Sequence, residues 1–166
     1  MHKTRQIPVF IWRWMKTLSW SMVRSYNGKS RMSRMVLLLT TTGRKTGLDR
    51  TTPLQYEEID GVYYVASARG PVADWFCNLQ ANPKVQVRVG ERQFDALAEA
   101  ITDPRRIADF LEYRLKRHPR MIGTLLRMEG LPSRHTRAEL EQFAVEKAVA
   151  ALHPTDAQDA VQGSKS

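Results

Sequence analysis

The stretch LLTTTGRKTGLDRTTPL (residues 38–54) consists of two extended segments joined by a short turn. The first segment, 35–41, is apolar and rich in β-branched residues, and the second segment, 51–57, follows the turn. Gly43 and Gly47 bracket the turn, where the chain must change direction. These features predict a strand–turn–strand unit at the start of a sheet.

The turn between these segments also concentrates positive charge. Arg44, Lys45 and Arg50 lie in or beside it, among several threonine hydroxyls. Successive exposed amides in a glycine-containing turn form a concave anion site, and arginine grips phosphate oxygens with two nitrogens. An ordinary basic hairpin loop has the same composition. The residues alone leave both interpretations open.

Further short strands follow this unit. An Asp60-Gly61 turn, typical of hairpins, precedes the apolar run 62–68. Later, apolar and polar residues alternate over 85–89, and Gly90-Glu91 turns the chain into a last segment, 93–101. About five strands, linked mostly by hairpins, favour an antiparallel arrangement over a parallel one. The sequence therefore predicts an α+β fold built on a small antiparallel barrel or sheet.

Helices are predicted between and after these strands, from capping residues and apolar spacing. They comprise 73–81, which Asn82-Pro83 ends; a helix capped by Asp103 with Pro104 at its first position; a short helix around 121–128 that begins at Pro119; and a helix over 137–152, opened by the capping-box pair Thr136 and Glu139. The last residues of that final helix alternatively form a closing strand.

Composition limits the class of protein. The chain has 166 residues, which fits one domain with an appendage, and its single cysteine excludes an internal disulfide and a multi-cysteine zinc site. We therefore predict no metal site. Apolar runs are far shorter than a membrane span needs, and no secretory signal is expected. These features predict a cytoplasmic protein that is soluble or attached peripherally to a membrane.

Three regions are predicted along the chain. Residues 1–34 would form an amphipathic basic N-terminal helix and a connector, 35–152 the barrel domain with helical additions, and 153–166 a disordered tail. The charge is uneven: 1–50 hold 11 Lys/Arg and one acid, whereas 51–166 hold 15 bases and 16 acids. An anionic partner is therefore to be sought near the first third of the chain.

The segment 7–24 has helical apolar spacing and carries Trp12, Trp14 and Trp20 among basic residues. Tryptophan beside Lys or Arg suits a membrane interface, where the ring lies at headgroup level. A helix packed on the domain, with its tryptophans buried, explains the same pattern. Nucleic acid is a further anionic partner, but no nucleic-acid motif supports it, and we predict none.

The usual catalytic signatures are absent from the sequence. It has no His-x-x-x-His pair, no Gly-x-Ser-x-Gly and no Gly-x-Gly-x-x-Gly. The Gly43-Arg44-Lys45-Thr46 run differs from a phosphate-binding P-loop, because the lysine does not follow the glycine directly and Leu38 stands where the first glycine is needed. A nucleoside triphosphatase is therefore not expected.

Four motifs in order carry a resemblance. They are Leu-Leu-Thr-Thr-Thr-Gly-Arg-Lys-Thr-Gly (38–47), Arg50 with Thr52-Pro53-Leu54, Val65-Ala66-Ser67, and Asp74-Trp75-Phe76 through Asn78-Leu79-Gln80-Ala81-Asn82-Pro83. Together they resemble the deazaflavin-dependent nitroreductase family over about residues 35–101, and more loosely to about 152. The resemblance implies a split β-barrel related to the folds that bind flavin mononucleotide.

The resemblance also implies a cofactor, coenzyme F420, whose phosphodiester and oligoglutamate tail are anionic. By the family pattern, the residues would divide by role: Arg44, Lys45 and Arg50 toward the anionic tail; Thr46, Thr52 and Pro53 along the ribityl–phosphate path; Ala66, Ser67, Ala68 and Gly70 at the ring; and Trp75 and Asn78 closing the pocket. Flavin mononucleotide is the alternative cofactor.

An enzyme of this kind needs no catalytic triad, because hydride transfer is the chemistry of the cofactor. A proton donor is still useful as charge develops on the reduced acceptor. Ser67, Tyr56, Tyr113 and His118 are candidates by residue type, and Ser67 and Tyr56 are the two we select. The leading hypothesis is an oxidoreductase that gives a hydride from reduced F420 to a small-molecule acceptor: a quinone, enone or nitro compound. A carrier of a deazaflavin, flavin, haem or lipid is the alternative, and the oligomeric state stays open.

The chain departs from the family pattern in two places. The ring loop commonly has two glycines after the serine, whereas here it has Ala68-Arg69-Gly70, with one glycine lost and a cation gained. The region after residue 102 does not match the tyrosine-bearing segment of members that reduce nitroaromatic compounds. Cofactor binding is therefore better supported by the sequence than any particular acceptor.

Overall fold

The computed structural model describes residues 24, 26, 29 and 34–155. Its elements, in chain order, are β1 (Val36–Thr42), β2 (Asp49–Ile59), β3 (Val62–Ser67), the 3-10 turn η2 (Gly70–Val72), α2 (Asp74–Ala81), β4 (Lys84–Val89), β5 (Arg92–Ile101), α3 (Pro104–Arg117), α4 (Pro119–Met128), α5 (Arg137–Ala144) and β6 (Ala148–Pro154). The predicted helix over 7–24 and the predicted tail beyond residue 155 lie outside the described residues. The limits proposed for three regions of the chain stay a prediction.

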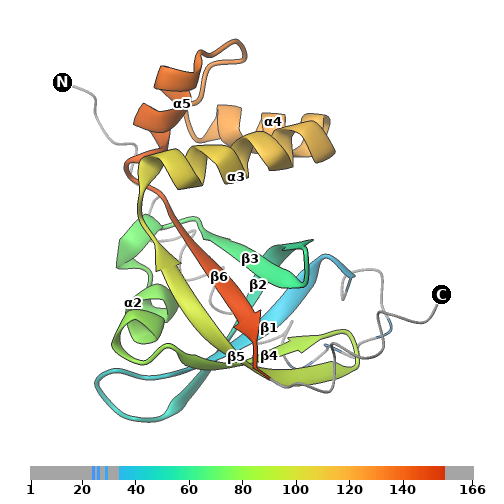
Figure 1. Ribbon diagram of the computed structural model, residues 1–166, viewed down its shortest axis with the longest axis vertical. Helices are drawn as coiled ribbons and strands as arrows, with labels where there is room; N and C mark the ends of the chain where they lie inside the picture. The colour runs from blue at the N-terminus through green and yellow to red at the C-terminus, as the bar shows by residue number, and fades with distance from the viewer. Residues whose placement is uncertain (1–23, 25, 27–28, 30–33, 156–166) are drawn as a thin grey trace.

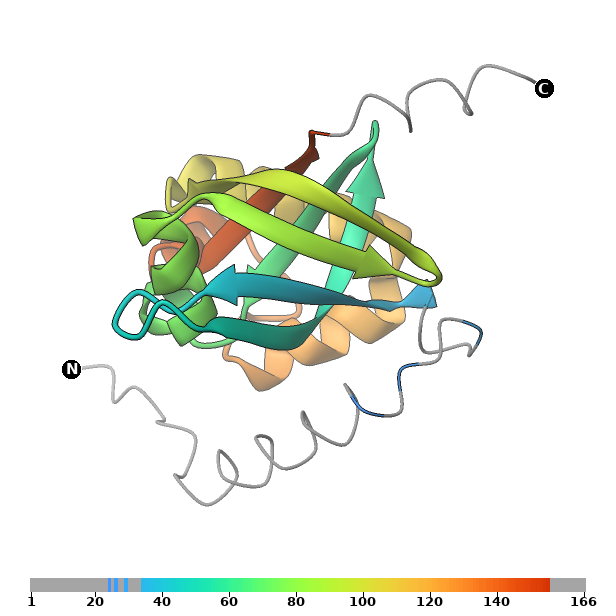
Figure 2. The ribbon, with the colours of Figure 1, turned by 90° about the horizontal axis from the view of Figure 1, so that it is seen from below.

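The described strands form a closed antiparallel barrel in the order β1-β2-β3-β6-β5-β4 (Figures 1 and 2). The expected hairpin turns are present: Asp60 and Gly61 both have positive φ, of 52° and 78°, as a tight hairpin requires. Alternating residues such as Leu37, Leu39 and Val87 point inward and are fully buried. The α+β fold class with a small antiparallel barrel is confirmed.

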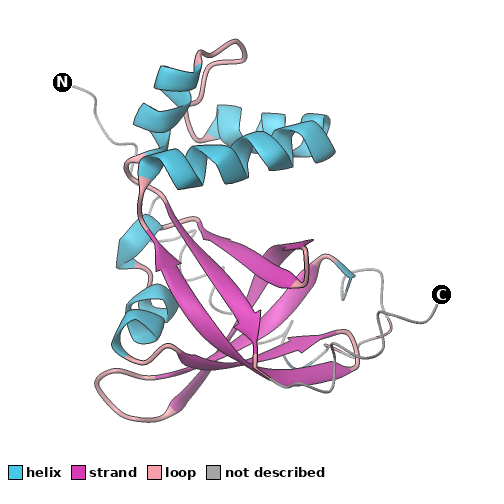
Figure 3. Ribbon diagram, in the orientation of Figure 1, coloured by secondary structure: helices cyan, strands magenta, loops and turns pink. Residues whose placement is uncertain are grey.

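Helices cover the barrel in two places (Figure 3). Helix α2 lies at one end and contributes Phe76 and Leu79 to the barrel core. Helices α3 to α5 form a layer on the outer face of the barrel, where Ile107 and Ile122 pack in a second core with Val149 of β6. The predicted capping box of Thr136 and Glu139 opens α5, and the expected Asp103 cap opens α3. None of the described helices is long and apolar enough to cross a membrane.

For the segment 137–152, the alternative prediction that its last residues form a closing strand is confirmed, and a helix over the whole segment is wrong. Helix α5 ends at Ala144, and β6 starts at Ala148 and fills the barrel between β3 and β5. Alanine favours a helix locally, but its small side chain also suits a strand buried on both faces. Pairing with two strands therefore overrides the local preference, and the barrel has six described strands rather than about five.

Strands β2 and β3 are paired along only part of their length. The register joins Tyr56–Ile59 to Val62–Val65, whereas the first half of β2, Asp49–Gln55, pairs only with β1 among the described strands. The first half of β2, Asp49–Gln55, and the end of β3 diverge from each other. We use the term β2–β3 seam for the place where they diverge. Leu54 and Tyr56 pack against the barrel core there but stay only partly buried: Leu54 has no partner on β3, and Tyr56 is the last residue of the pairing.

Candidate functional site

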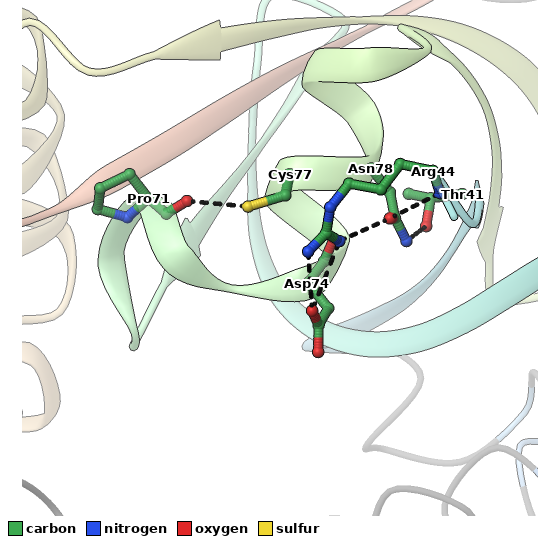
Figure 4. Close-up of polar contacts among 6 residues, drawn as sticks. All are labelled: Thr41, Arg44, Pro71, Asp74, Cys77 and Asn78. Carbon is green, nitrogen blue, oxygen red and sulfur yellow. Dashed lines mark hydrogen bonds and ion pairs between the residues drawn. The ribbon is translucent and has the colours of Figure 1, made fainter. Parts of the chain in front are cut away.

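The β1–β2 loop is fastened to helix α2 by one buried amide (Figure 4). The Asn78 Oδ1 atom accepts hydrogen bonds from the backbone N–H of Arg44 at 3.1 Å and from its Nη1 at 3.0 Å. The Asn78 Nδ2 atom donates to Thr41 Oγ1 at 3.2 Å. Asn78 is only 4% exposed, so these bonds replace hydration that its amide has lost. The residue therefore sets the position of the loop.

Arg44 is exposed, but its guanidinium is already paired within the protein. Its guanidinium contacts Asp74 Oδ1 at 3.4 Å and the Asp74 carbonyl oxygen at 3.4 Å (Figure 4). The Asp74 side chain is 70% exposed, so this ion pair contributes only about 0–1 kcal/mol to stability. The Asp74 carboxylate offsets the positive charge of Arg44. A ligand anion that approached Arg44 would therefore also approach this carboxylate. Its expected part in tail binding stays a prediction.

The amides of the β1–β2 loop are largely used inside the loop. Gly43 N donates to Leu48 O at 2.8 Å, Gly47 N donates to Gly43 O at 2.7 Å, and Leu48 N donates to Thr46 Oγ1 at 3.3 Å. Thr46 thus closes the turn from within. The exposed cations Lys45 and Arg50 are consequently the groups of this loop best placed to meet an anion.

The end of β3 forms the opposite side of the seam and combines a buried hydroxyl with a constrained glycine. Ser67 is 4% exposed, and its Oγ has no hydrogen-bond partner among the described residues. Gly70 has a φ of +64°, and a Cβ there would lie 2.2 Å from the carbonyl oxygen of Glu146. Only glycine fits this backbone and this close approach. Ala68, between Ser67 and Gly70, is exposed. Ala66, just before Ser67, packs against the helical layer.

Trp75 lies in the barrel core. It is 8% exposed and meets Phe76 edge-to-face, with ring centroids 5.7 Å apart. One turn of α2 is further held by Cys77, whose Sγ donates to the Pro71 carbonyl oxygen at 3.3 Å. Trp75 therefore anchors α2 across the end of the barrel, and its part in closing a cofactor pocket stays a prediction.

Tyr56 stands where β2 and β3 separate. Its ring centroid lies 5.7 Å from that of Tyr63, which is buried in the core. Burial, aided by the nearby Tyr63 and Glu58, raises the pKa of the Tyr56 phenol above 10.0. The phenol therefore keeps its proton at neutral pH and is half-buried, a combination suited to donating a hydrogen bond or a proton.

The structure brings the predicted cofactor residues to one end of the barrel. Thr46, Arg50, Thr52 and Pro53 lie on the β1–β2 loop and the first half of β2, and the residues from Ala66 to Gly70 lie at the end of β3. Helix α2 joins the two sides, because it follows η2 directly and holds the loop through Asn78. The roles of the individual residues stay predictions.

Sequence reasoning missed a buried cluster on the second half of β2. Glu57 is 7% exposed and faces Arg114 Nε at 3.5 Å, Arg117 Nε at 3.6 Å and His118 Nε2 at 3.3 Å. Burial lowers the pKa of Arg114 despite the adjacent carboxylate. A glutamate in a strand gives no local signal of this kind, because its partners come from α3 and the start of α4.

Comparison with known proteins identifies the family of this chain. A sequence model of the F420H(2)-dependent quinone reductase family matches residues 14–120, well over half of the chain. This chain belongs to that family. The matched residues include the β1–β2 loop, the seam and α2. The narrower expectation of a nitroreductase is not part of this finding.

Among curated members of the F420H(2)-dependent quinone reductase family, a similar protein is the F420H(2)-dependent quinone reductase Rv1261c of Mycobacterium tuberculosis (strain ATCC 25618 / H37Rv). It is 38% identical over 68 residues, which cover 39% of this chain and 46% of the relative. The chain thus spans about half the length of the curated relatives it matches.

Solved structures show the same fold at low sequence identity. A structure described as a domain-swapped dimer has a TM-score of 0.52 and 21% identity, covering 87% of this chain and 98% of its own. HutZ, the haem storage protein of Vibrio cholerae, has a TM-score of 0.50 and 17% identity, covering 82% and 89%. Such proteins share the barrel of this family, and a shared barrel does not fix a function.

Proposed function

We propose that this chain binds reduced coenzyme F420 and transfers a hydride from it to an electron-poor organic acceptor: a quinone, an enone or a nitro compound. The observation that carries the proposal is the family match over residues 14–120, which spans both sides of the seam. The name of the curated relative specifies a quinone, so a quinone is the first acceptor to test.

The residues around the seam fit an anionic cofactor with a flat ring. Lys45 and Arg50 are exposed cations suited to a phosphodiester and an oligoglutamate tail. Leu54 offers a partly exposed apolar surface, and Ser67 Oγ is a buried polar atom that lacks a partner among the described residues. Bound in its reduced form, F420 would supply the hydride, so no catalytic triad is required of the chain.

The remaining work of such an enzyme falls to the chain itself. The α2 anchor formed by Trp75 and Phe76 gives the site a rigid floor, and Asn78 holds the loop that would meet the tail. Tyr56 keeps a proton on its Oη at neutral pH and stands beside the opening, so it is the first candidate for protonating a reduced acceptor. Ser67 is the second candidate.

The cofactor assignment is tested by titrating the protein with F420 and, separately, with flavin mononucleotide, and following fluorescence. We expect saturable binding of F420 and much weaker binding of the flavin, because only F420 carries the oligoglutamate tail that Lys45 and Arg50 would meet. Binding of the flavin alone would overturn the F420 assignment.

A steady-state turnover assay distinguishes an enzyme from a protein that only carries its ligand. A carrier of a deazaflavin, flavin, haem or lipid would bind its ligand without consuming it. We expect reduced F420 to be oxidised continuously when menadione is added, at a rate proportional to protein concentration. Tight binding of reduced F420 without steady oxidation, over several quinone, enone and nitro acceptors, would favour the carrier instead.

The tryptophan-rich segment 7–24 is proposed to contact an anionic membrane surface, where a lipophilic acceptor would be met. Its support is the alternation of tryptophan with Arg13, Lys16 and Arg24 in the sequence. Replacing these three cations by glutamine should weaken binding to phosphatidylglycerol vesicles, whereas Lys84→Gln should not. Equal binding by both variants would leave packing on the domain as the better explanation of this segment.

A further inference from the structure

Helix α4 presents an apolar row to solvent. Its inner face is formed by Ile122 and Leu126, which are buried in the second core. Met121, Leu125 and Met128, spaced by four and three residues, remain 42%, 39% and 82% exposed. Residues at this spacing lie on one side of a helix. Single exposed apolar residues are common on proteins, but a row of three on one short helix marks a contact surface.

The same helix is bordered by positive charge, and its own segment of the sequence contains no acid. Residues 114–128 contain five Lys/Arg and no Asp or Glu, within a part of the chain whose overall balance is slightly acidic. Arg114 and Arg117 are drawn to Glu57. Arg120 and Arg127 are exposed on α4 itself, and Arg127 donates a hydrogen bond to Thr124 Oγ1 at 3.1 Å. The surface of α4 is therefore apolar on one flank and cationic on the other.

Helix α4 is held firmly at both ends. At its start, His118 Nε2 lies 3.3 Å from Glu57 Oε1. After its end, Glu129 pairs with Lys147. Glu57 adjoins Tyr56 at the seam, and Lys147 follows Glu146, whose carbonyl oxygen lies against Gly70. The helix is thus tied to β2 at its start and to the segment just before β6 after its end.

We propose that the outer face of α4, defined by Met121, Leu125, Met128, Arg120 and Arg127, docks on an anionic lipid surface. An apolar row inserts at the headgroup level while flanking arginines extend to lipid phosphates. A protein partner is less well matched, because a stable protein interface buries about 800 Å² on each side, and the row is confined to one helix of ten residues. Neither of the two hollows described on the surface, of about 230 and 260 Å³, is lined by α4 residues.

This docking surface stands independently of the reductase activity, and only its use, bringing the seam to a lipophilic acceptor, rests on the proposed function. It is also distinct from the segment 7–24, so the test needs a readout local to α4. In a Cys77→Ser background, which keeps a donor to Pro71, Met128→Cys is labelled with a polarity-sensitive fluorophore. Leu97→Cys on β5, at a position 47% exposed, provides the matched control label.

Phosphatidylcholine vesicles with phosphatidylglycerol should shift the emission of the label at position 128 to the blue and leave the label at 97 unchanged. Vesicles of phosphatidylcholine alone should shift neither. An unchanged emission at 128 on vesicles that bind the protein would overturn the proposal, because binding would then occur through another surface.

Unlabelled full-length variants test the same surface by co-sedimentation with anionic vesicles. The pair Arg120→Gln and Arg127→Gln should lower the partition coefficient by about thirtyfold, since each cation near an anionic surface contributes on the order of 1 kcal/mol. The pair Met121→Gln and Met128→Gln should also lower the partition coefficient. The factor by which it falls should be larger at high salt, where charge is screened, than at low salt. Arg105→Gln, an exposed arginine of α3, is the control.

Two outcomes of these variants would contradict lipid docking. The first is that the variants bind vesicles as well as the unmodified chain does. The other is a loss of self-association in sedimentation velocity without any loss of vesicle binding, which would make the row a contact between copies of this chain. Turnover of menadione, a water-dispersed acceptor, should be unchanged in all these variants, so a failed reductase assay and a failed docking assay remain separate results.

Discussion

Strand β2 pairs with β1 along its first half and with β3 along its second half, and the two halves treat charge in opposite ways. In the first half, Arg50 is exposed at the seam. In the second half, Glu57 is buried and surrounded by Arg114, Arg117 and His118. The charge of Arg50 faces solvent, where a ligand can contact it. The charge of Glu57 is paired with cations of the helical layer and so joins the barrel to its helices. The same strand thus carries the candidate site at one end and a structural joint at the other.

The largest effect is expected from breaking the joint. Glu57→Ala leaves Arg114, 7% exposed, without its carboxylate, and removal of one partner from a buried ion pair costs about 3–5 kcal/mol. Urea unfolding should show this loss in the free energy of unfolding. The double variant Glu57→Met with Arg114→Met removes both charges and should restore much of the stability. If the free energy of unfolding of Glu57→Ala were within about 1 kcal/mol of that of the unmodified chain, the ion pairs of Glu57 would contribute no more than exposed ion pairs do.

The second effect concerns Tyr56, at the boundary between the two halves. If its phenol protonates the reduced acceptor, Tyr56→Phe should lower kcat by about a hundredfold while leaving the cofactor Kd unchanged. Because the pKa of Tyr56 is raised above 10.0, the proton-bearing form persists through neutral pH. The rate of the unmodified enzyme should therefore stay constant through neutral pH and decline only at a higher pH than an ordinary tyrosine phenol would give. An equal kcat in the phenylalanine variant would transfer the role to Ser67 or to water.

Much of the first half of β2 was predictable and much of the second half was not. Alternating apolar residues, paired glycines and a run of threonines indicate strands and turns from neighbours in the chain, and the motif around 38–54 indicated the site end of the barrel. Asn78 was singled out by its motif, but its partners Thr41 and Arg44 are defined only by the way α2 folds back.

The joint and the closing strand depend on contacts between distant residues. Glu57 meets cations from α3 and α4, and no local pattern specifies which strand residue they reach. The alanines of 148–152 favour a helix by themselves, and become a strand only because β3 and β5 leave a place between them. Patterns of period two predict the surfaces of a barrel better than they predict its last strand.

A third, smaller effect is expected at the loop that borders the first half of β2. Asn78→Ala removes the bonds to Arg44 and Thr41 from a buried position and should cost about 1–3 kcal/mol of unfolding free energy. F420 should bind several-fold more weakly, because the loop loses its fixed position. Asp74→Ala, which removes only the exposed ion pair, should cost under about 1 kcal/mol. Equal losses from both variants would show that the loop is held by charge rather than by the buried amide.

The smallest effect on stability, and the sharpest test of the comparison, comes from Arg50. Its side chain is exposed on the first half of β2, so Arg50→Ala should change the free energy of unfolding by no more than about 0.5 kcal/mol. The Kd for F420 should nevertheless rise about fivefold at low salt, and the difference should shrink as salt screens the cofactor tail. A cofactor lacking the oligoglutamate tail should bind both proteins alike, and Arg105→Ala on α3 should alter neither Kd. If Arg50→Ala instead destabilised the fold without changing the Kd, both halves of β2 would be structural, and the site would have to lie elsewhere on the barrel.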